Sequence, residues 1–296
     1  MDTQALKAFL AVAEIGSFSQ AAEVLHLTQS AVSKRVQNLE EQLGTSLFDR
    51  HNRTISLTES GQALLPKAKA ILDLVADTEL EIQSQKREVA GKLSLVTSHH
   101  IGLHRLPPYL REFTSRFPNA HLDLTFMSSE LAYQAVSQRK VELALSTLDG
   151  LALVEHESLS IQPLWTDEML CVCSPTHPLA QQQQLTLADL AATPAILPEA
   201  HTITYKLVER VFHQHQLSLY APMPTNYLET IKMMISVGMG WSMLPHTMLD
   251  ESLHVLPWPA EPLKRPLGLI QLRTRTLSNA ARAFMQVIQK QSTNLT

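Results

Sequence analysis

Hydrophobic residues near the start of the chain recur at helical intervals in a short segment that precedes a turn. The apolar positions of this segment are Phe18, Ala21, Ala22, Val24 and Leu25. The small side chains of Ala21 and Ala22 allow a second helix to cross at close range, as a helix-turn-helix requires. Ser17 and Ser19 are both candidate caps, because a serine hydroxyl accepts a hydrogen bond from a free N–H group of the first turn.

A second helix is predicted after a turn at His26 and Leu27, with Thr28 as its N-cap. The face expected to be buried consists of Ala31, Val32, Val36, Leu39 and Leu43. The polar side supplies the candidate DNA contacts Thr28, Gln29, Ser30, Ser33, Lys34, Arg35 and Gln37. Amide and hydroxyl groups can exchange hydrogen bonds with base edges, and cations can reach guanine or phosphate, so this helix suits a major groove. An ordinary solvated helix face carries similar residues, and this face alone does not decide between the two interpretations.

The segment 47–58 favours DNA recognition, because it predicts two short strands around a polar turn. Such a wing places Arg50 and Arg53 where they can meet phosphates or a minor groove. The alternative is a salt-bridged surface hairpin, which the preceding helix pair makes the weaker interpretation. The N-terminal domain is therefore predicted to be an all-α winged helix-turn-helix over residues 1–58.

A long helix is predicted from Thr58 to about Arg87, and residues 59–90 are assigned to it as a linker. Its apolar stripe consists of Leu64, Leu65, Ala68, Ile71, Leu72, Val75 and Ile82. About 30 residues at 1.5 Å each give a rod near 45 Å long, which cannot bury such a stripe alone. Pairing with the same helix of a second chain would cover the stripe and present two recognition helices to two DNA half-sites. Packing against its own C-terminal domain is the alternative.

From residue 91 the pattern alternates strands with helices, which indicates βαβ units and a parallel sheet. The predicted strands are 93–97, 121–127, 143–146, 168–174, 222–225, 241–244 and 267–272. The predicted helices are 106–117, 131–138, 204–215, 227–237 and 277–290. The fold class is therefore α/β overall, with a two-lobed domain over residues 91–296. Lobe 1 takes residues 91–162 and 267–296, lobe 2 takes 163–266, and the chain crosses between them near residues 162 and 266.

Composition narrows the class of partner. The net charge is −4, and residues 1–58 contain five Lys or Arg against six Asp or Glu, so DNA binding depends on where the cations lie rather than on bulk charge. No apolar run approaches the ~18 residues of a membrane helix and no signal peptide opens the chain, so we expect a cytoplasmic protein without a membrane partner.

The N-terminal segment resembles the signature of LysR-type transcriptional regulators. The resemblance is carried by Ala21, Ala22, the run 29–33, Leu39, Glu40, Leu43, Gly44, Leu47, Phe48, Arg50, Leu57, Thr58 and Gly61. The chain length, the long helix and the run 238–245 extend it, whereas the run 140–145 departs from the acidic pattern that is common in that family. The resemblance implies a ligand-responsive repressor or activator that binds an operator as a homodimer or homotetramer and acts with RNA polymerase. It also implies a regulatory domain similar to periplasmic solute-binding proteins, with a small-molecule effector between the lobes.

Candidate effector contacts lie where predicted strands end and helices begin, because free backbone N–H groups there favour anions such as a carboxylate. These candidates are Ser98, His99, His100, Ser128, Ser146, Thr147, His201 and Thr202, with Met127, Tyr227 and Trp241 as apolar walls. Helix capping is the alternative role for each hydroxyl. Ser98 gains support from the resemblance, which implies an effector contact by a Ser or Thr in that loop.

Four other interpretations have weaker support in the sequence. The first is a metal sensor that uses His99, His100 and His104. No cysteine is near these histidines in the sequence, and no HxxxH pair with a glutamate base occurs nearby, so we expect no metal or cofactor. Cys171 and Cys173 are the only cysteines, and we expect them to point to opposite faces of a strand as core residues rather than redox sensors. An enzyme is disfavoured because the sequence has no nucleophile elbow, Walker loop or GxGxxG motif. A solute-binding module without DNA activity leaves the N-terminal segment unexplained.

Overall fold

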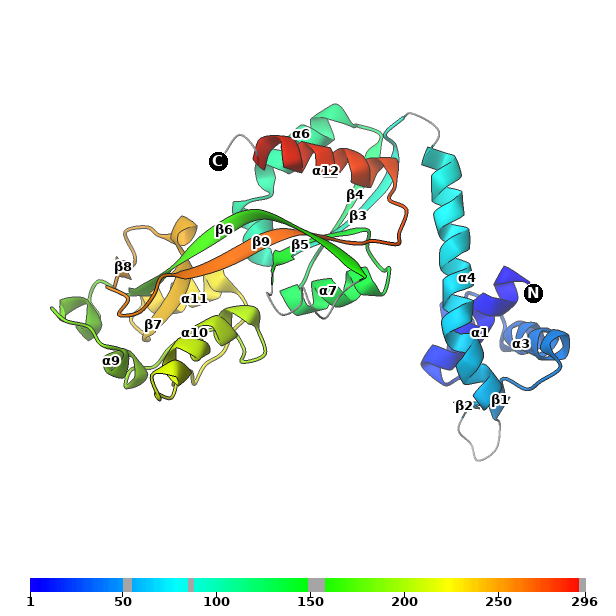
Figure 1. Cartoon of the computed structure of the whole chain (residues 1–296), viewed down its shortest axis with the longest axis horizontal. Helices are drawn as coiled ribbons and strands as arrows, with labels where there is room; N and C mark the ends of the chain where they lie inside the picture. The colour runs from blue at the N-terminus through cyan, green and yellow to red at the C-terminus, as the bar shows by residue number, and fades with distance from the viewer. Residues whose placement is uncertain (50–54, 85–87, 149–157, 293–296) are drawn as a thin grey trace. The chain divides into compact units, whose positions relative to one another are not determined.

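The computed structural model describes residues 1–49, 55–84, 88–148 and 158–292. Internal contacts divide the chain into two compact units, Met1–Lys86 and Arg87–Thr296. The elements of each unit are labelled in Figure 1. Each unit has its own hydrophobic core, and the two are described separately.

The first unit is helical apart from one short hairpin. Its elements are α1 (Thr3–Ile15), α2 (Phe18–Val24), α3 (Gln29–Leu43), β1 (Phe48–Asp49), β2 (Ser56–Leu57) and α4 (Glu59–Ser84). The predicted helix pair and both of its caps are confirmed: the Ser17 hydroxyl accepts a hydrogen bond from the N–H of Gln20, and that of Thr28 accepts one from Ala31. α1 completes the core, since Leu6, Phe9 and Val12 are buried against α2 and α3.

The hairpin predicted as a wing is present at its base, where Phe48 pairs with Leu57 and Asp49 with Ser56 in antiparallel register. Residues 50–54, and with them both wing arginines, lie outside the described residues. Gly61 fixes how closely α4 approaches this base. A side chain there is excluded, because an added Cβ would lie 2.2 Å from the carbonyl oxygen of Leu47.

The long helix α4 divides its apolar stripe between two environments. Its first half packs on the core of its own unit through Leu64, Leu65, Ala68, Ile71 and Leu72. Farther along, Val75 is 37% and Ile82 62% exposed. The prediction that the whole stripe needs an outside partner is therefore wrong for the first half, because α1 and the helix-turn-helix core already cover it.

The second unit contains a mixed sheet. Its strands are β3 (Gly91–Thr97), β4 (Ala120–Phe126), β5 (Leu143–Thr147), β6 (Leu159–Cys173), β7 (Trp241–Pro245), β8 (His254–Val255) and β9 (Leu263–Leu272). Their order is β4-β3-β5-β9-β6-β7, and β8 pairs with β6. β3 is parallel to both β4 and β5, which confirms the predicted βαβ wiring, whereas β6, β7, β8 and β9 join antiparallel.

In each lobe, helices pack on both faces of the sheet. They are α5 (His99–His104), α6 (Pro107–Arg116), α7 (Ser129–Ser137), α9 (Leu187–Ala191), α10 (Ile203–Gln214), α11 (Leu228–Ser236) and α12 (Asn279–Ser292), with short 3-10 turns η1 (Pro178–Gln181) and η2 (His246–Met248). In lobe 1, α6 and α12 lie on one face of β3, β4 and β5 and α7 lies on the other (Figure 1). In lobe 2, α9 and α10 pack on one side of β6 and β7 and α11 on the other.

Two long strands connect the lobes. β6 and β9 pair from Leu159–Leu272 to Met169–Leu263, with an irregularity between Pro163 and Trp165. The crossings predicted near residues 162 and 266 fall inside these two continuous strands. Sequence patterns identified only the second part of β6, because Pro163 interrupts its alternation of apolar and polar residues.

Two local predictions are wrong. Residues 222–225 form no strand, because the prolines at 222 and 224 have no N–H group to donate, and the segment keeps a single bond to Leu197 through Thr225. Cys171 and Cys173 share one face of β6 and one core cluster, because alternate residues of a strand point to the same side. Both remain buried core residues, as expected.

Candidate DNA-contacting helix and effector cleft

The polar side of α3 is largely accessible. The side chains of Thr28, Gln29, Ser30, Lys34 and Gln37 are exposed, and those of Ser33 and Arg35 are half-buried. Beneath them Val32, Val36 and Leu39 are fully buried, which fixes the orientation of the helix on its unit. One helix thus separates an apolar anchoring side from a polar side that offers donors and acceptors to a partner.

Two candidate contacts already have partners within the unit. The Nη1 atom of Arg35 donates to Oε1 of Gln4 on α1 at 3.2 Å, and Nε2 of Gln37 donates to Oε1 of Glu41 at 3.2 Å. Both acceptors are neutral or solvent-exposed, so a phosphate or a base edge can compete for these donors. Gln29 and Ser30 are the exposed members in the first turn of the helix, and Lys34 follows one turn later.

Two residues expected on buried faces are exposed instead: Val24 is 64% and Leu43 42% exposed. Val24 ends α2 and Leu43 ends α3, so no further helical turn covers them. The apolar pattern predicted both helices correctly but extended their buried faces by one residue.

Glu40 attaches the wing to α3. Its Oε1 atom accepts hydrogen bonds from the N–H groups of Leu47 at 2.7 Å and Phe48 at 3.3 Å. The aromatic rings of Phe9 and Phe18 hold Phe48 from the core side, with ring centroids 5.4 and 5.7 Å away. Helix and wing base are therefore positioned as one rigid element.

In the second unit a cavity of about 850 Å³ lies between the lobes. Seven of the eight predicted polar contacts line it, namely Ser98, His99, His100, Ser128, Thr147, His201 and Thr202, together with Tyr227, which was predicted as an apolar wall. Met127 also lines it, as predicted for an apolar wall. The cavity is of the size that binds small molecules.

Three of these hydroxyls are helix caps, and they come from both lobes. Ser98 accepts a hydrogen bond from the N–H of Ile101 in α5, Ser128 from Leu131 in α7, and Thr202 from Tyr205 in α10. The capping alternative is thus correct for all three, and it is compatible with ligand binding, since capped helix N-termini still favour anions.

Two predicted residues do not reach the cavity. Ser146 is fully buried in the centre of β5, so it lies within the sheet instead of in a loop after it. Trp241 is fully buried in the core of lobe 2, where its indole Nε1 donates to the carbonyl groups of Leu190 and Thr193. Ser146 was expected in a loop after its strand, but β5 continues to Thr147. Trp241 begins β7 as predicted, but its side chain packs into the core of lobe 2 instead of the cavity.

The cavity contains groups that sequence patterns missed. Glu130, at the start of α7 in lobe 1, accepts a hydrogen bond through Oε1 from the N–H of Ile203 in lobe 2 at 3.2 Å. A carboxylate from one lobe therefore occupies the helix N-terminus of the other. Arg265, only 4% exposed, also lines the cavity, and its Nε atom has no hydrogen-bond partner within the described residues. A buried cation on a crossing strand has no local sequence signal.

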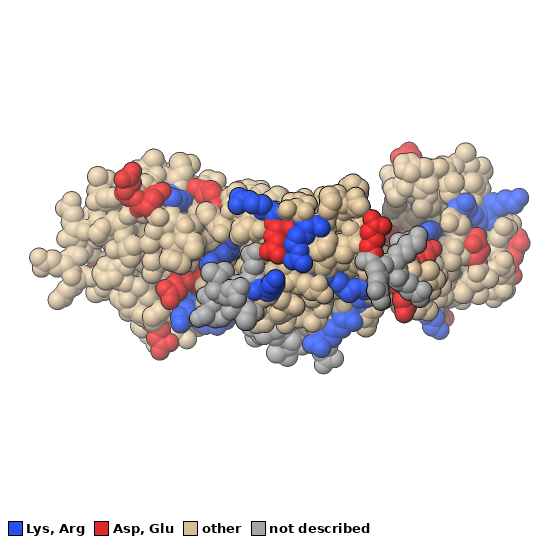
Figure 2. Space-filling model, turned by 90° about the horizontal axis from the view of Figure 1, so that it is seen from above, with Lys and Arg blue, Asp and Glu red and all other residues tan. Residues whose placement is uncertain are grey.

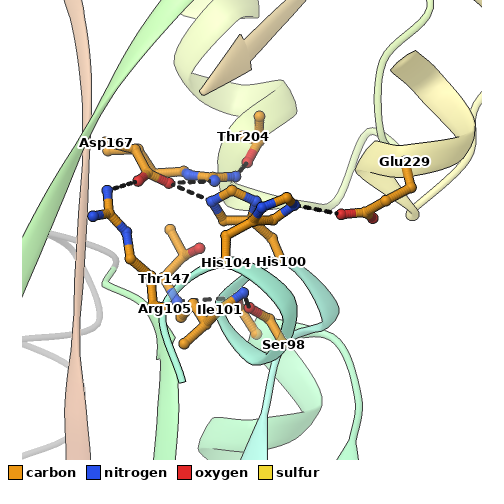
Figure 3. Close-up of polar contacts among 11 residues, drawn as sticks. Ser98, His100, Ile101, His104, Arg105, Thr147, Asp167, Thr204 and Glu229 are labelled. Atoms are coloured by element: carbon orange, nitrogen blue, oxygen red, sulfur yellow. Dashed lines mark hydrogen bonds and ion pairs between the residues drawn. The ribbon is translucent and has the colours of Figure 1, made fainter. Parts of the chain in front are cut away.

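Arg265 belongs to a charged network centred on Asp167, which is fully buried (Figure 3). The Asp167 carboxylate lies 2.7 Å from Arg265, 2.9 Å from Arg105 and 3.1 Å from Nε2 of His100. Burial by itself would raise the pKa of Asp167, but the contacts with His100, Arg265 and Arg105 outweigh it and hold the pKa below its usual range. Nη1 of Arg265 also donates to the Thr204 hydroxyl on α10 at 3.1 Å.

Aromatic rings line one side of the cavity. The ring of His99 stacks on Phe126 at 5.1 Å and meets the edge of Tyr227 at 4.7 Å, which joins a residue of lobe 2 to two of lobe 1. Gly102 makes room for this stack, because an added Cβ there would lie 2.3 Å from the Phe126 ring.

Two family models match the chain. Residues 3–62 match the bacterial regulatory helix-turn-helix protein, lysR family, and residues 86–293 match the LysR substrate binding domain. The chain belongs to the LysR family. It is a transcriptional regulator, not an enzyme, with a helix-turn-helix DNA-binding domain and a substrate-binding domain, as the resemblance implied.

Curated LysR-type relatives resemble it over nearly their whole length. The chain is 32% identical over 286 residues to the uncharacterized HTH-type transcriptional regulator YeiE of Escherichia coli K12, covering 95% of this chain and 94% of that one. It is 30% identical over 295 residues to a "Probable RuBisCO transcriptional regulator" of Synechocystis, covering 97% and 85%. Over 108 residues, 36% of this chain and 75% of the relative, it is 58% identical to an uncharacterized HTH-type regulator of Azotobacter vinelandii.

Solved LysR-type structures share the fold. Full-length CbnR complexed with its target DNA has a TM-score of 0.60 at 22% identity, covering 98% of this chain and 99% of that one. Full-length BenM has a TM-score of 0.58 at 20% identity, covering 99% and 97%. An OxyR of Pseudomonas aeruginosa has a TM-score of 0.68 at 19% identity, covering 99% and 94%.

The surroundings of the cysteines in this LysR-type regulator bear on the redox alternative. Burial raises the pKa of the Cys173 thiol to about 11 and also raises that of Cys171, so neither is an activated thiolate. Within the described residues no helix combines the length and apolarity needed to cross a membrane.

Proposed function

We propose that this LysR-type regulator binds an operator through the polar side of α3 and the wing, and that a small anionic effector in the cavity between the lobes controls it. Regulators of this family bind DNA operators and act as oligomers. The exposed second half of α4 would supply part of the contact between chains. RNA polymerase is the further partner that transcription control requires, and the cytoplasm is where these partners meet.

One observation carries the effector proposal: the capped N-termini of α7 and α10, from opposite lobes, open on the same cavity. Free N–H groups and helix dipoles at both ends attract negative charge. Arg265 adds a positive charge to the lining, and His99 and His201 add donors. A small carboxylate satisfies these groups, and the Glu130 carboxylate on Ile203 marks one place where it would bind.

The polar side of α3 carries the DNA proposal. Lys34 is suited to a phosphate, which contributes affinity without sequence preference, and Gln29 and Ser33 are suited to base edges. On the face drawn in Figure 2, Lys and Arg are interspersed with Asp and Glu among the coloured residues. Recognition would thus depend on a few placed cations, in agreement with the net charge of −4.

Effector binding is tested by screening small carboxylates, amino acids and aromatic acids against the full-length protein by thermal shift. Tryptophan fluorescence is a suitable signal, because Trp165, Trp241 and Trp258 all lie in the second unit. A ligand that binds only the folded state raises the melting temperature. Thr202→Ala should reduce the shift for the best ligand by weakening its affinity.

Thr186→Ala is the matched control, because Thr186 caps α9 through the same type of hydrogen bond but does not line the cavity. Both variants lose a helix cap, and only Thr202→Ala should lose ligand affinity. Equal shifts in the two variants would contradict the cavity as the binding site.

DNA recognition is tested by gel shifts with the operator and with point-substituted operators. Lys34→Ala should weaken binding to all sequences and reduce the salt dependence by about one phosphate contact. Gln29→Ala should reduce discrimination between bases by about 1–3 kcal/mol at one position. Lys92→Ala, which removes an exposed lysine of the second unit, is the control and should bind like the wild type.

A further inference from the structure

Beside the cavity, two histidines and a glutamate gather from both lobes. His100 and His104 are four residues apart on α5, and Glu229 lies in the first turn of α11. One side-chain ligand atom of each residue lies within 4.8 Å of the other two. These two helices belong to different lobes, so sequence spacing shows the histidine pair but not its acidic partner.

The two more accessible members are already in contact. Nε2 of His104 lies 3.0 Å from Oε1 of Glu229, and their side chains are 30% and 38% exposed (Figure 3). The rings of His100 and His104 are 4.9 Å apart at 37°. His104 therefore lies between a carboxylate and a second imidazole.

The third member, His100, is 5% exposed and has an unusual arrangement of its ring nitrogens. Nε2 lies 3.1 Å from the Asp167 carboxylate, which as an anion only accepts hydrogen bonds, so the proton of a neutral His100 belongs on Nε2. Nδ1 then carries a free lone pair. Within the part of the chain that the structure describes, neither buried ring nitrogen has a hydrogen bond of good geometry, but Nε2 has the Asp167 carboxylate beside it and Nδ1 has no polar partner.

We propose that His100, His104 and Glu229 bind one divalent transition-metal ion, of the Zn²⁺ class, that joins the two lobes beside the effector cavity. Two neutral imidazoles and a carboxylate form a three-ligand set typical of zinc sites that keep a fourth position open. Asp167 acts through His100: a carboxylate on the other ring nitrogen fixes the tautomer and raises the basicity of the ligating nitrogen.

An ordinary ion pair between His104 and Glu229 is the competing explanation, and it accounts for only two of the three residues. It leaves the lone pair on Nδ1 of His100 buried without a partner, which is costly in a folded protein. A metal ion uses that lone pair. The nearby guanidinium groups of Arg105 and Arg265 share the Asp167 carboxylate, which offsets part of their repulsion of a cation.

Ligand type separates the candidate ions. Imidazole nitrogens favour Zn²⁺, Ni²⁺, Co²⁺ and Cu²⁺ over Mg²⁺ and Ca²⁺, which prefer oxygen. Bonds of about 2.1 Å in a tetrahedron place ligand atoms about 3.4 Å apart. The separations of up to 4.8 Å would therefore have to shorten, which the partly exposed side chains of His104 and Glu229 permit. Metal binding would then draw α5 and α11 together.

The test is calorimetric titration of the chelator-treated full-length protein with Zn²⁺, with Co²⁺ absorption in the visible range as a second readout of tetrahedral nitrogen ligation. We expect one ion per chain. His104→Gln and Glu229→Gln should each weaken binding at least tenfold and change the Co²⁺ spectrum. Circular dichroism without metal should match the wild type, because both residues lie at the surface.

His201→Gln and Glu199→Gln are the matched controls. Nδ1 of His201 lies 3.2 Å from Oε2 of Glu199, so this exposed pair resembles that of His104 and Glu229 but has no third ligand in the described residues. Both controls should bind Zn²⁺ like the wild type. Undiminished Zn²⁺ affinity in His104→Gln and Glu229→Gln would overturn the proposal and assign the binding to surface histidines. A wild-type protein that binds no stoichiometric ion would overturn it as well.

Discussion

Arg265 faces Asp167 across the antiparallel strands β9 and β6, and its Nη2 atom lies 2.7 Å from Oδ2 of Asp167. The pair is buried on the β6–β9 ladder, which runs from one lobe into the other. It also contacts both lobes, because Arg105 and His100 reach Asp167 from lobe 1 and Thr204 reaches Arg265 from lobe 2. Stability of the second unit and geometry of the cavity are therefore coupled through one carboxylate.

The first prediction concerns this carboxylate. Asp167→Asn should lower the free energy of unfolding of the second unit by about 3–5 kcal/mol, because it leaves two guanidinium groups without their anionic partner. Urea unfolding followed by tryptophan fluorescence, in buffer with a chelator, measures it. Asp123→Asn removes an exposed ion pair with Lys92 and should cost less than about 1 kcal/mol. An equal decrease in the free energy of unfolding in the two variants would show that the buried network stabilises the unit no more than an exposed ion pair does.

The second prediction concerns the attachment of the wing. Glu40→Ala should reduce operator affinity and the thermal stability of the first unit, because the N–H groups of Leu47 and Phe48 lose their acceptor, at a cost of about 1–3 kcal/mol. Gel shifts and circular dichroism measure the two effects. Glu23→Ala removes an equal charge from an exposed position on α2 and serves as the control. A wing fixed by other contacts would leave both variants with wild-type affinity.

The third prediction concerns the carboxylate that crosses the cavity. Glu130→Gln should raise the affinity for a carboxylate effector severalfold, because it removes a negative charge from the N-terminus of α10 that the ligand would otherwise have to displace. Calorimetry with the best ligand from the thermal-shift screen measures it. Glu168→Gln, an exposed change of the same charge outside the cavity lining, should have no effect. Weaker binding in Glu130→Gln would mean that Glu130 supports the ligand instead of competing with it.

The fourth prediction concerns the exposed half of the α4 stripe. Val75→Glu combined with Ile82→Glu should shift the protein toward monomers, because burying two carboxylates in an apolar contact is strongly unfavourable. Analytical ultracentrifugation over a concentration series measures the association constant. Ala70→Glu adds the same group to an exposed position on the opposite side of α4 and should leave association intact. Unchanged association of the double variant would place the contact between chains elsewhere.

Sequence patterns predicted most of the longer helices and the parallel strands, because each depends on residues close in the chain, but they gave no helix for α1, α5 or α9. Thr28 and Ser17 cap the helices as expected, and Pro107 starts α6. The same reasoning located the cavity, since the order of β3 and β4 brings Ser98 and Ser128 to one edge of the sheet and a cap motif marks Thr202 at the start of α10. These contacts required no knowledge of side-chain packing.

The residues that were missed depend on contacts between distant segments. Arg265 and Asp167 meet only because β6 and β9 pair in a register that no local pattern encodes. Glu229 reaches His104 across 125 positions of sequence. Ser146 was placed in a loop because an apolar run does not reveal where a buried strand stops. Trp241 was expected at the cavity because its position at the start of a strand does not show which core its side chain enters. The charged groups of the cavity come from segments far apart in the chain, so only the folded structure shows which of them are in contact.

The pairing of β6 with β9 from Leu159 to Met169 sets the kind of motion that this domain can make. Two separate single-stranded connections would let the lobes swivel freely about each bond. A hydrogen-bonded pair of strands instead bends out of its own plane more easily than the strands slide past each other. The irregular step between Pro163 and Trp165 is where this bending would be easiest. Ligand binding in the cavity would then rotate one lobe against the other about a fixed axis.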